Sequence, residues 1–137
     1  MAKTDYGHWK GKRFDPAEHF GFVYNITNTT NGRIYIGQKQ LHRIEKKKPL
    51  KGRKNKRHFK KDSDWRKYTG SSNELNADIE RLGKECFQFK IMELHESKWE
   101  MSYCEYSMII KKGAVLKESY YNLFLGRIGC PPKRLIK

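Results

Sequence analysis

The sequence is poor in cysteine, in long apolar runs and in acidic residues. Its three cysteines, Cys86, Cys104 and Cys130, are odd in number and lack any Cys-x-x-Cys spacing. Neither a disulfide framework nor a zinc site is therefore indicated, and we expect reduced, mostly structural thiols. No stretch approaches eighteen consecutive apolar residues, and residues 1–20 are too polar to contain the apolar segment of a signal peptide. The expected protein has no membrane contact and resides in the cytoplasm.

Basic residues outnumber acidic ones by two to one. Thirty Lys and Arg stand against fifteen Asp and Glu, so a chain of 137 residues carries a formal net charge of +15. Such a charge on a chain of single-domain length indicates a polyanionic partner, and nucleic acid is the first candidate.

Ten of the basic residues lie in "KKKPLKGRKNKRHFKK", residues 46–61, which contains no acid. Pro49 and Gly52 interrupt any helix, so a loop is expected. The run is interpretable as a solvated loop or a localisation-like signal. We favour a loop that follows a phosphate backbone, because the run lies inside the domain. The candidate DNA-binding residues are Lys51, Arg53, Lys54, Lys56, Arg57, His58, Lys60 and Lys61.

A β-hairpin is predicted between residues 21 and 37. In "GFVYNIT" the apolar residues alternate, "RIYIG" forms a second strand, and Asn31-Gly32 favours the turn between them. Each strand carries a tyrosine, Tyr24 or Tyr35. Tyrosine is common in strands, so a purely structural role would also explain both.

Two helices and a third strand follow. A capping box of Ser71 with Glu74 starts a helix that ends at Gly83, and residues 87–94 form a strand that should be largely buried. A second box, Ser97 with Glu100, starts a helix that ends at Gly113. The expected fold is α+β, a small three-stranded antiparallel sheet flanked by helices. We expect an irregular N-terminal arm (1–18), one domain (19–125) with a basic loop insertion (44–64), and a tail (126–137).

Glu105 is the carboxylate in this region that requires an explanation. It lies beside the inward stripe of the second helix, which includes Met101, Cys104 and Met108. It is either a surface residue paired with a lysine of the basic loop or a metal ligand beside an anion-binding surface. The helix alone does not distinguish the two.

Four separated features resemble the GIY-YIG nucleases. Phe22-Val23-Tyr24, ten intervening residues and Tyr35-Ile36-Gly37 are similar to the paired signature of that family, with Phe22 in the place of its first glycine. Glu105 in "CEYSMI" resembles the metal-binding glutamate, and Asn122 in "YYN" resembles the asparagine that closes the module. The basic insertion followed by "DSDWRKYTGSS" is similar to small phage-encoded members.

The resemblance implies a role for each matching residue. Glu105 would bind one Mg²⁺ or Mn²⁺, Tyr24 would be the general base for water, and Tyr35 would orient the water or Tyr24. The family usually places its phosphate-clamping arginine on a helix after the second signature, and here that arginine would be Arg43, with Arg53 and Arg57 as rivals. Supporting roles fall to Gly37, Lys39 and His42, and Asn122 would support the region of Glu105 by hydrogen bonding. For His42 and His58 a structural or DNA-contacting role is favoured over a catalytic one.

The function that the resemblance implies is a metal-dependent endonuclease that nicks or cleaves double-stranded DNA. It would act as a monomer or a homodimer, as a free-standing, homing-type enzyme in the host cytoplasm if it is phage-encoded. The alternative is a non-catalytic nucleic-acid-binding protein that uses the basic loop and exposed aromatic residues such as Trp65, Tyr68 and Trp99. That alternative explains the charge but not the spacing of the four features.

Overall fold

A computed structural model describes residues 5–47, 52, 57–123, 125 and 132–136. The central sheet has four strands in the order β1-β6-β2-β3: β1 (Trp9–Lys10), β2 (Gly21–Asn28), β3 (Ile34–Gln40) and β6 (Phe87–His95). The hairpin predicted at residues 21–37 is confirmed as β2 and β3, which pair antiparallel and place Tyr24 opposite Gly37 and Ile26 opposite Tyr35. Strand β2 also pairs antiparallel with β6.

The expected three-stranded antiparallel sheet is wrong in one respect, because β1 adds a fourth strand that runs parallel to β6. This strand comes from the segment expected to be an irregular arm. Its Trp9 is only 5 % exposed and contacts the rings of Phe22, Tyr24 and Phe89 at centroid distances of 4.8 to 5.7 Å. Two residues are too few to show a periodic pattern, so the burial of Trp9 was not visible in the sequence.

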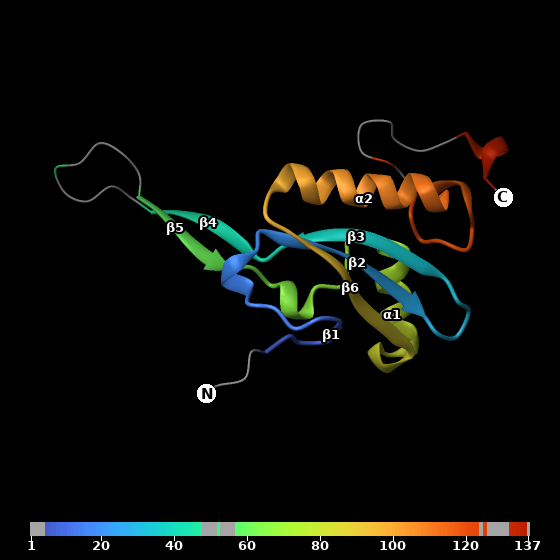
Figure 1. The fold of residues 1–137 in the computed structure, drawn as a ribbon. Helices are drawn as coiled ribbons and strands as arrows, with labels where there is room; N and C mark the ends of the chain where they lie inside the picture. Colours follow the sequence, from blue (N-terminus) through green and yellow to red (C-terminus); the bar gives the residue numbers. More distant parts are fainter. Residues whose placement is uncertain (1–4, 48–51, 53–56, 124, 126–131, 137) are drawn as a thin grey trace.

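The two long helices lie on opposite faces of the sheet, α1 (Asn73–Leu82) on one and α2 (Lys98–Lys112) on the other (Figure 1). Ser97 caps α2 as expected, since its hydroxyl accepts a hydrogen bond from the Glu100 N–H. Helix α1 is capped by Ser72 rather than Ser71. Gly83 and Gly113 follow the last residues of the two helices, as predicted. Short 3-10 helices span Pro16–Glu18, Trp65–Lys67, Lys84–Cys86, Ala114–Leu116 and Lys133–Leu135.

Each face of the sheet has its own apolar core. The core on the α1 face contains Trp9, Phe22, Tyr24, Trp65, Leu75 and Phe89 among others, and the core on the α2 face contains Val23, Ile36, Met101, Ile109 and Ala114. Strand β2 contributes Phe22 and Tyr24 to the first core and Val23 to the second, so both of its faces are covered. Strand β6 is less buried than expected, because Met92 is 38 % exposed. The register shifts at Val23/Tyr24, where their partners on β6 are Glu93 and Ile91, so Met92 is the extra residue of a bulge.

The basic insertion forms a two-stranded ribbon rather than the expected loop. Strand β4 (His42–Lys47) pairs antiparallel with β5 (Arg57–Asp62), and the ribbon extends away from the end of β3 (Figure 1). Pro49 and Gly52 exclude a helix, but they lie between the strands and leave both free to pair. Of the predicted DNA-binding residues, Arg57, His58, Lys60 and Lys61 lie on β5, whereas Lys51, Arg53, Lys54 and Lys56 lie outside the described residues.

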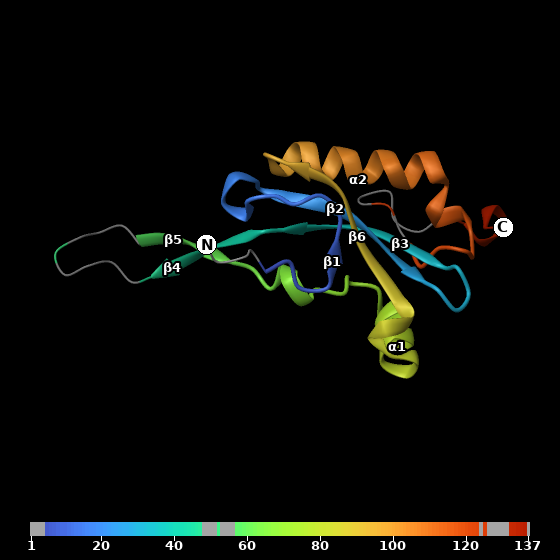
Figure 2. The same cartoon turned by 60° about the horizontal axis from the view of Figure 1, so that its bottom comes forward.

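The base of the ribbon is anchored in the core on the α1 face. Leu41, between β3 and β4, is fully buried. Its N–H donates to Phe20 O and its carbonyl accepts from Ser63 N–H, both at 3.0 Å. Figure 2 shows β3 leading directly into β4. Among the helices of the described part of the chain, none has the length and apolar character needed to span a membrane.

Candidate active site

The Tyr24 phenol reaches the outer strand β3 because Gly37 has no side chain. Tyr24 is on the inner strand β2, is 1 % exposed, and lies directly opposite Gly37. A Cβ built at position 37 would stand 2.5 Å from the Tyr24 hydroxyl oxygen and 2.6 Å from Cζ. Glycine at this position therefore gives the phenol the space it occupies.

The segment of residues 68–72, before α1, supplies a second wall. The Tyr24 ring lies 6.2 Å from the ring of Tyr35 and 6.3 Å from that of Tyr68. Gly70 has a φ of +84°, and a Cβ there would come within 2.9 Å of the Tyr35 ring and 3.2 Å of the Tyr24 hydroxyl. The hydroxyls of Tyr35 and Ser71 are 3.1 Å apart and form a hydrogen bond. This segment thus fits closely around both signature tyrosines.

Asn122 holds the segment after α2 against β3. Its side-chain carbonyl accepts from the Ile36 N–H at 3.0 Å, and its NH₂ donates to the Ile36 carbonyl at 2.9 Å. Tyr121 N–H also donates to Ile34 O. Asn122 was expected to support the region of Glu105. Its side-chain bonds run instead to β3, between Tyr35 and Gly37, so it fixes the strand that carries the second signature.

These groups meet at a cavity of about 240 Å³ that includes Glu105. Helix α2 packs on the face of the sheet opposite α1, yet its Glu105 lines the same cavity as Tyr24 and Tyr35. The lining residues are Tyr24, Tyr35, Ile36, Gly37, Gln38, Tyr68, Ser71, Glu105, Tyr106, Ile109, Asn122 and Leu123. The chain therefore brings together both tyrosines, Gly37, Glu105 and Asn122, which are separated by up to 98 positions in the sequence.

Burial dominates the electrostatics of this site. Burial raises the pKa of Glu105 from 4.5 to about 7. It also raises the pKa of Tyr24 well above its usual value, helped by Tyr35, Tyr68 and Glu105, and it raises the pKa values of Tyr35 and Tyr68. The protein by itself thus disfavours a phenolate at Tyr24. Deprotonation of this tyrosine needs added positive charge nearby.

The cavity fits a hard divalent cation. Glu105 is the only carboxylate among the described residues that line it, and it has no hydrogen-bond or ion-pair partner in the described ranges 5–47, 52, 57–123, 125 and 132–136. The expected alternative, a pairing of Glu105 with a lysine, is not seen there. A part-buried, unpaired carboxylate among hydroxyl groups suits Mg²⁺ or Mn²⁺, because Mg²⁺ keeps several waters and needs few protein ligands.

Other sequence-predicted residues lie away from the cavity. Arg43 is exposed on β4, opposite Lys61, rather than on a helix. His42 has a structural place at the ribbon base, where its Nε2 lies 2.7 Å from Pro16 O. Lys39 is closer to the site: its Nζ lies 4.0 Å from the centre of the Tyr68 ring and 2.7 Å from an Asp64 carboxylate oxygen.

Sequence reasoning did not assign Tyr68, Gly70 or Ser71 to the site. Tyr68 was considered only as an exposed base-stacking residue, together with Trp65, and Trp65 is in fact fully buried. The visible signal was a glycine flanked by hydroxyl side chains directly before a helix cap. Nothing in that pattern shows that the segment folds beside the β2–β3 hairpin.

The fold and the site together define a small α+β module in which two hairpin tyrosines and a helix glutamate line one cavity. The family model described as "Putative endonuclease segE, GIY-YIG domain" matches residues 6–125. The chain belongs to this GIY-YIG endonuclease family, so its expected class as a nuclease acting on DNA is confirmed. No curated protein and no solved structure matched the chain.

Proposed function

We propose that this protein is a divalent-metal-dependent endonuclease that hydrolyses phosphodiester bonds of double-stranded DNA at the cavity between Tyr24, Tyr35 and Glu105. The observation that carries the proposal is the convergence of these three side chains on one cavity, although they come from β2, β3 and α2. We also propose a phage-encoded, free-standing, homing-type enzyme that acts in the host cytoplasm.

Glu105 would hold the cation, Mg²⁺ or Mn²⁺. When bound, the ion supplies positive charge that stabilises the phosphoryl oxygens and the leaving 3′ oxygen. Glu105 can take this role because its carboxylate faces the cavity without a protein partner among the described residues. A single carboxylate implies one metal ion per site.

Tyr24, as the phenolate that a nearby cation would favour, would accept the proton of the attacking water. The water oxygen would form a bond to phosphorus, the bond from phosphorus to the 3′ oxygen would break, and the 3′ oxygen would take a proton from solvent, so the products are a 5′-phosphate and a 3′-hydroxyl. The rigid placement of Tyr24 over Gly37 keeps its hydroxyl at one position. Tyr35, held by its hydrogen bond to Ser71, would orient the water or Tyr24.

A cation outside the cavity would clamp the scissile phosphate. Arg43 remains our candidate from the family resemblance, with Arg53 and Arg57 as rivals. Because Arg43 does not line the cavity, it could contact the scissile phosphate only if DNA lay across both the cavity and the ribbon. Among the described residues, the Lys39 ammonium group lies over the ring of Tyr68, which lines the cavity. The charged ribbon would supply most of the sequence-independent affinity.

A plasmid assay tests the proposal. Wild-type protein with supercoiled DNA and Mg²⁺ or Mn²⁺ should produce nicked circles first, because one site cuts one strand; linear DNA should follow by dimer action or a second event. Glu105→Gln and Tyr24→Phe should each reduce nicking by about 10²-fold or more, as typical losses of a charge-stabilising group or general base do.

Glu100→Gln is the matched control, since Glu100 lies on the same helix but is exposed and does not line the cavity. It should cut like wild type. If wild-type protein binds DNA but neither nicks nor linearises it with any divalent metal, the chain is a non-catalytic nucleic-acid-binding protein and the proposal is wrong.

A further inference from the structure

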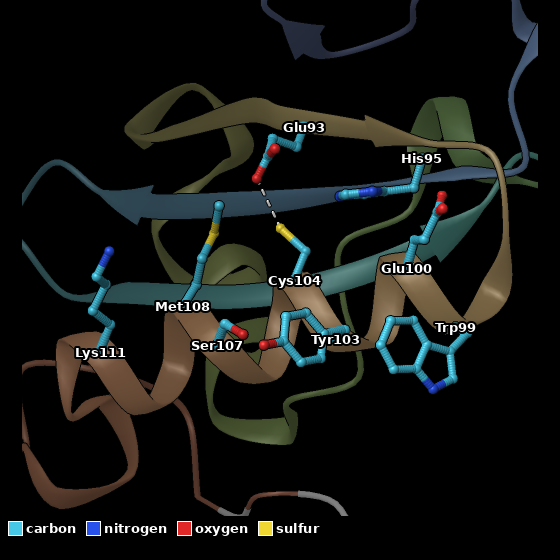
Figure 3. Close-up of a pocket in the computed structure, with 9 residues that line it drawn as sticks. All are labelled: Glu93, His95, Trp99, Glu100, Tyr103, Cys104, Ser107, Met108 and Lys111. Carbon is cyan, nitrogen blue, oxygen red and sulfur yellow. Dashed lines mark hydrogen bonds between the residues drawn. The ribbon is translucent and has the colours of Figure 1, made fainter.

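A second group of metal-ligating side chains lies between β6 and α2, apart from the cavity of Tyr24 and Glu105. Glu93 and His95 occupy alternate positions of β6, so both face α2, and Cys104 approaches them from the helix. Figure 3 shows the three side chains converging in the space between strand and helix. None of the three lines the candidate active site.

The ligand atoms of these residues are close enough to share one ion. One oxygen, nitrogen or sulfur from each side chain lies within 4.8 Å of the other two. Ligand atoms around a tetrahedral zinc ion are roughly 3.3–3.7 Å apart, from zinc bond lengths near 2.0–2.3 Å. Glu93 is exposed, so its side chain can rotate to complete the geometry.

One hydrogen bond and one unsatisfied nitrogen atom characterise this group of side chains. The Cys104 thiol donates a hydrogen bond to the Glu93 carboxylate, with sulfur and oxygen 2.9 Å apart. The thiol proton thus lies between two ligand atoms, where a cation would be placed. The Nε2 atom of His95 is buried and has no hydrogen-bond partner among the described residues. Such unsatisfied buried atoms are rare in folded proteins and call for an explanation such as a bound ion.

We propose that Glu93, His95 and Cys104 form a binding site for a soft or borderline divalent cation, Zn²⁺ first. Thiolate, imidazole and carboxylate are the ligand set that Zn²⁺ prefers, and Mg²⁺ does not use thiolate ligands. On binding, the Cys104 S–H bond breaks, its proton passes to solvent, and a metal–sulfur bond forms. The adjoining hollow of about 530 Å³ leaves space for a water or an exogenous ligand at the fourth position.

The ion would join the last residues of β6 to the second turn of α2. The strand and the helix are otherwise connected by the short segment between His95 and Lys98. Binding to the folded state alone stabilises it by mass action. Zn²⁺ at this site should therefore raise the thermal midpoint of the protein, independently of any ion in the active site.

Cobalt substitution tests the site directly. The metal-free protein is titrated with Co²⁺ and followed by absorbance, because a thiolate ligand gives a charge-transfer band in the near ultraviolet and a four-coordinate site gives intense visible bands. In wild-type protein the charge-transfer band should saturate at one equivalent of Co²⁺, Zn²⁺ should abolish the band, and Mg²⁺ should not. Glu105→Gln should give the same spectrum, which separates this site from the candidate active site.

Cys104→Ser should abolish the charge-transfer band, and His95→Gln should weaken binding by more than the roughly 10–100-fold typical of an outer-shell partner. Cys86→Ser is the matched control, because the Cys86 thiol bonds to Leu82 O elsewhere in the fold and its loss should leave the band unchanged. Circular dichroism confirms that each variant is folded. The absence of a band in wild type, or a band that survives Cys104→Ser, would overturn the proposal.

Discussion

Tyr24 and Gly37 face each other across the β2–β3 ladder, and the phenol of the first occupies the space that a side chain of the second would fill. The pairing has an energetic consequence. Because Tyr24 is almost fully buried, its ring cannot swing into solvent to make room for a methyl group. Position 37 therefore couples the stability of the sheet to the position of the proposed general base.

Gly37→Ala should lower the free energy of unfolding by about 1–3 kcal/mol, the usual cost of overpacking, and should reduce DNA nicking. Urea denaturation and the plasmid assay measure the two effects. In a Tyr24→Phe background the stability cost should be smaller, because the nearest clashing atom is gone. Gly32→Ala is a useful comparison, since Gly32 has a positive φ but nothing within 4 Å of an added Cβ. Equal costs for Gly37→Ala in the two backgrounds would contradict the clash.

Asn122→Ala should destabilise the protein by about 1–3 kcal/mol for each of the two Ile36 backbone groups left unpaired. Both groups bond to the Asn122 side chain, which is 7 % exposed. Asn73→Ala is the matched control, because Asn73 is exposed on α1. It should lower the free energy of unfolding far less than Asn122→Ala. The test is chemical denaturation of the three proteins. If Asn122→Ala lowers the free energy of unfolding no more than Asn73→Ala does, the two hydrogen bonds from Asn122 to Ile36 contribute little to stability.

Glu105 should make the stability of the metal-free protein fall as pH rises. Its pKa is about 7 in the folded state and 4.5 as an unperturbed group. Between these values the folded state holds the proton more tightly than the unfolded state, so the stabilising contribution is present below about 4.5 and is lost as pH rises through about 7. Glu105→Gln has no such proton and should lack this part of the pH dependence.

The same proton competes with the metal. At limiting Mg²⁺ the nicking rate should therefore rise with pH up to about 7, and more Mg²⁺ should move this acidic limb to lower pH. Rates at several Mg²⁺ concentrations and denaturation from pH 4 to 8 measure the two effects. An acidic limb that stays fixed over all Mg²⁺ concentrations would argue that a group other than Glu105 controls it.

Lys39 and Arg43 should affect different kinetic constants. Lys39 contacts the Tyr68 ring at the cavity, so Lys39→Ala should lower the rate at saturating DNA. Arg43 is exposed on the ribbon, so Arg43→Ala should mainly weaken DNA binding and reduce the slope of log affinity against log salt concentration by about 1. Single-turnover rates and fluorescence anisotropy separate the two. If Arg43→Ala instead slows the reaction at saturating DNA, Arg43 is the clamp that the family resemblance implies.

The parts of the fold that were predictable from the sequence are those set by local patterns. The alternation of Phe22, Tyr24 and Ile26 indicated β2, and the capping box at Ser97 with Gly113 set the limits of α2. The short β1 was not predictable, because its pairing with β6 is decided by the burial of Trp9 in the assembled core. The ribbon was not predicted, because its sequence consists mainly of like charges and lacks the apolar alternation that indicates a strand. Its two strands are held together by backbone hydrogen bonds.

For the site, the order of Tyr24, Tyr35, Glu105 and Asn122 along the chain was informative only through the family resemblance. Their convergence depends on α2 packing over the sheet, which no local pattern specifies. Tyr68 and Ser71 are site residues that the sequence did not reveal. They join the cavity through tertiary contacts with the two signature tyrosines, made by a segment without periodicity.

The attachment of the ribbon has a further consequence for engineering. Among the residues that the structure describes, the buried Leu41 and the hydrogen bond from the Ser63 hydroxyl to Gln40 O fasten the ribbon to the body at the junction. The register of β2 with β3 ends before this junction. A ribbon of another length or charge could therefore be exchanged between positions 43 and 61 without shifting the tyrosines, which, under the proposed function, would make affinity for DNA a transplantable property.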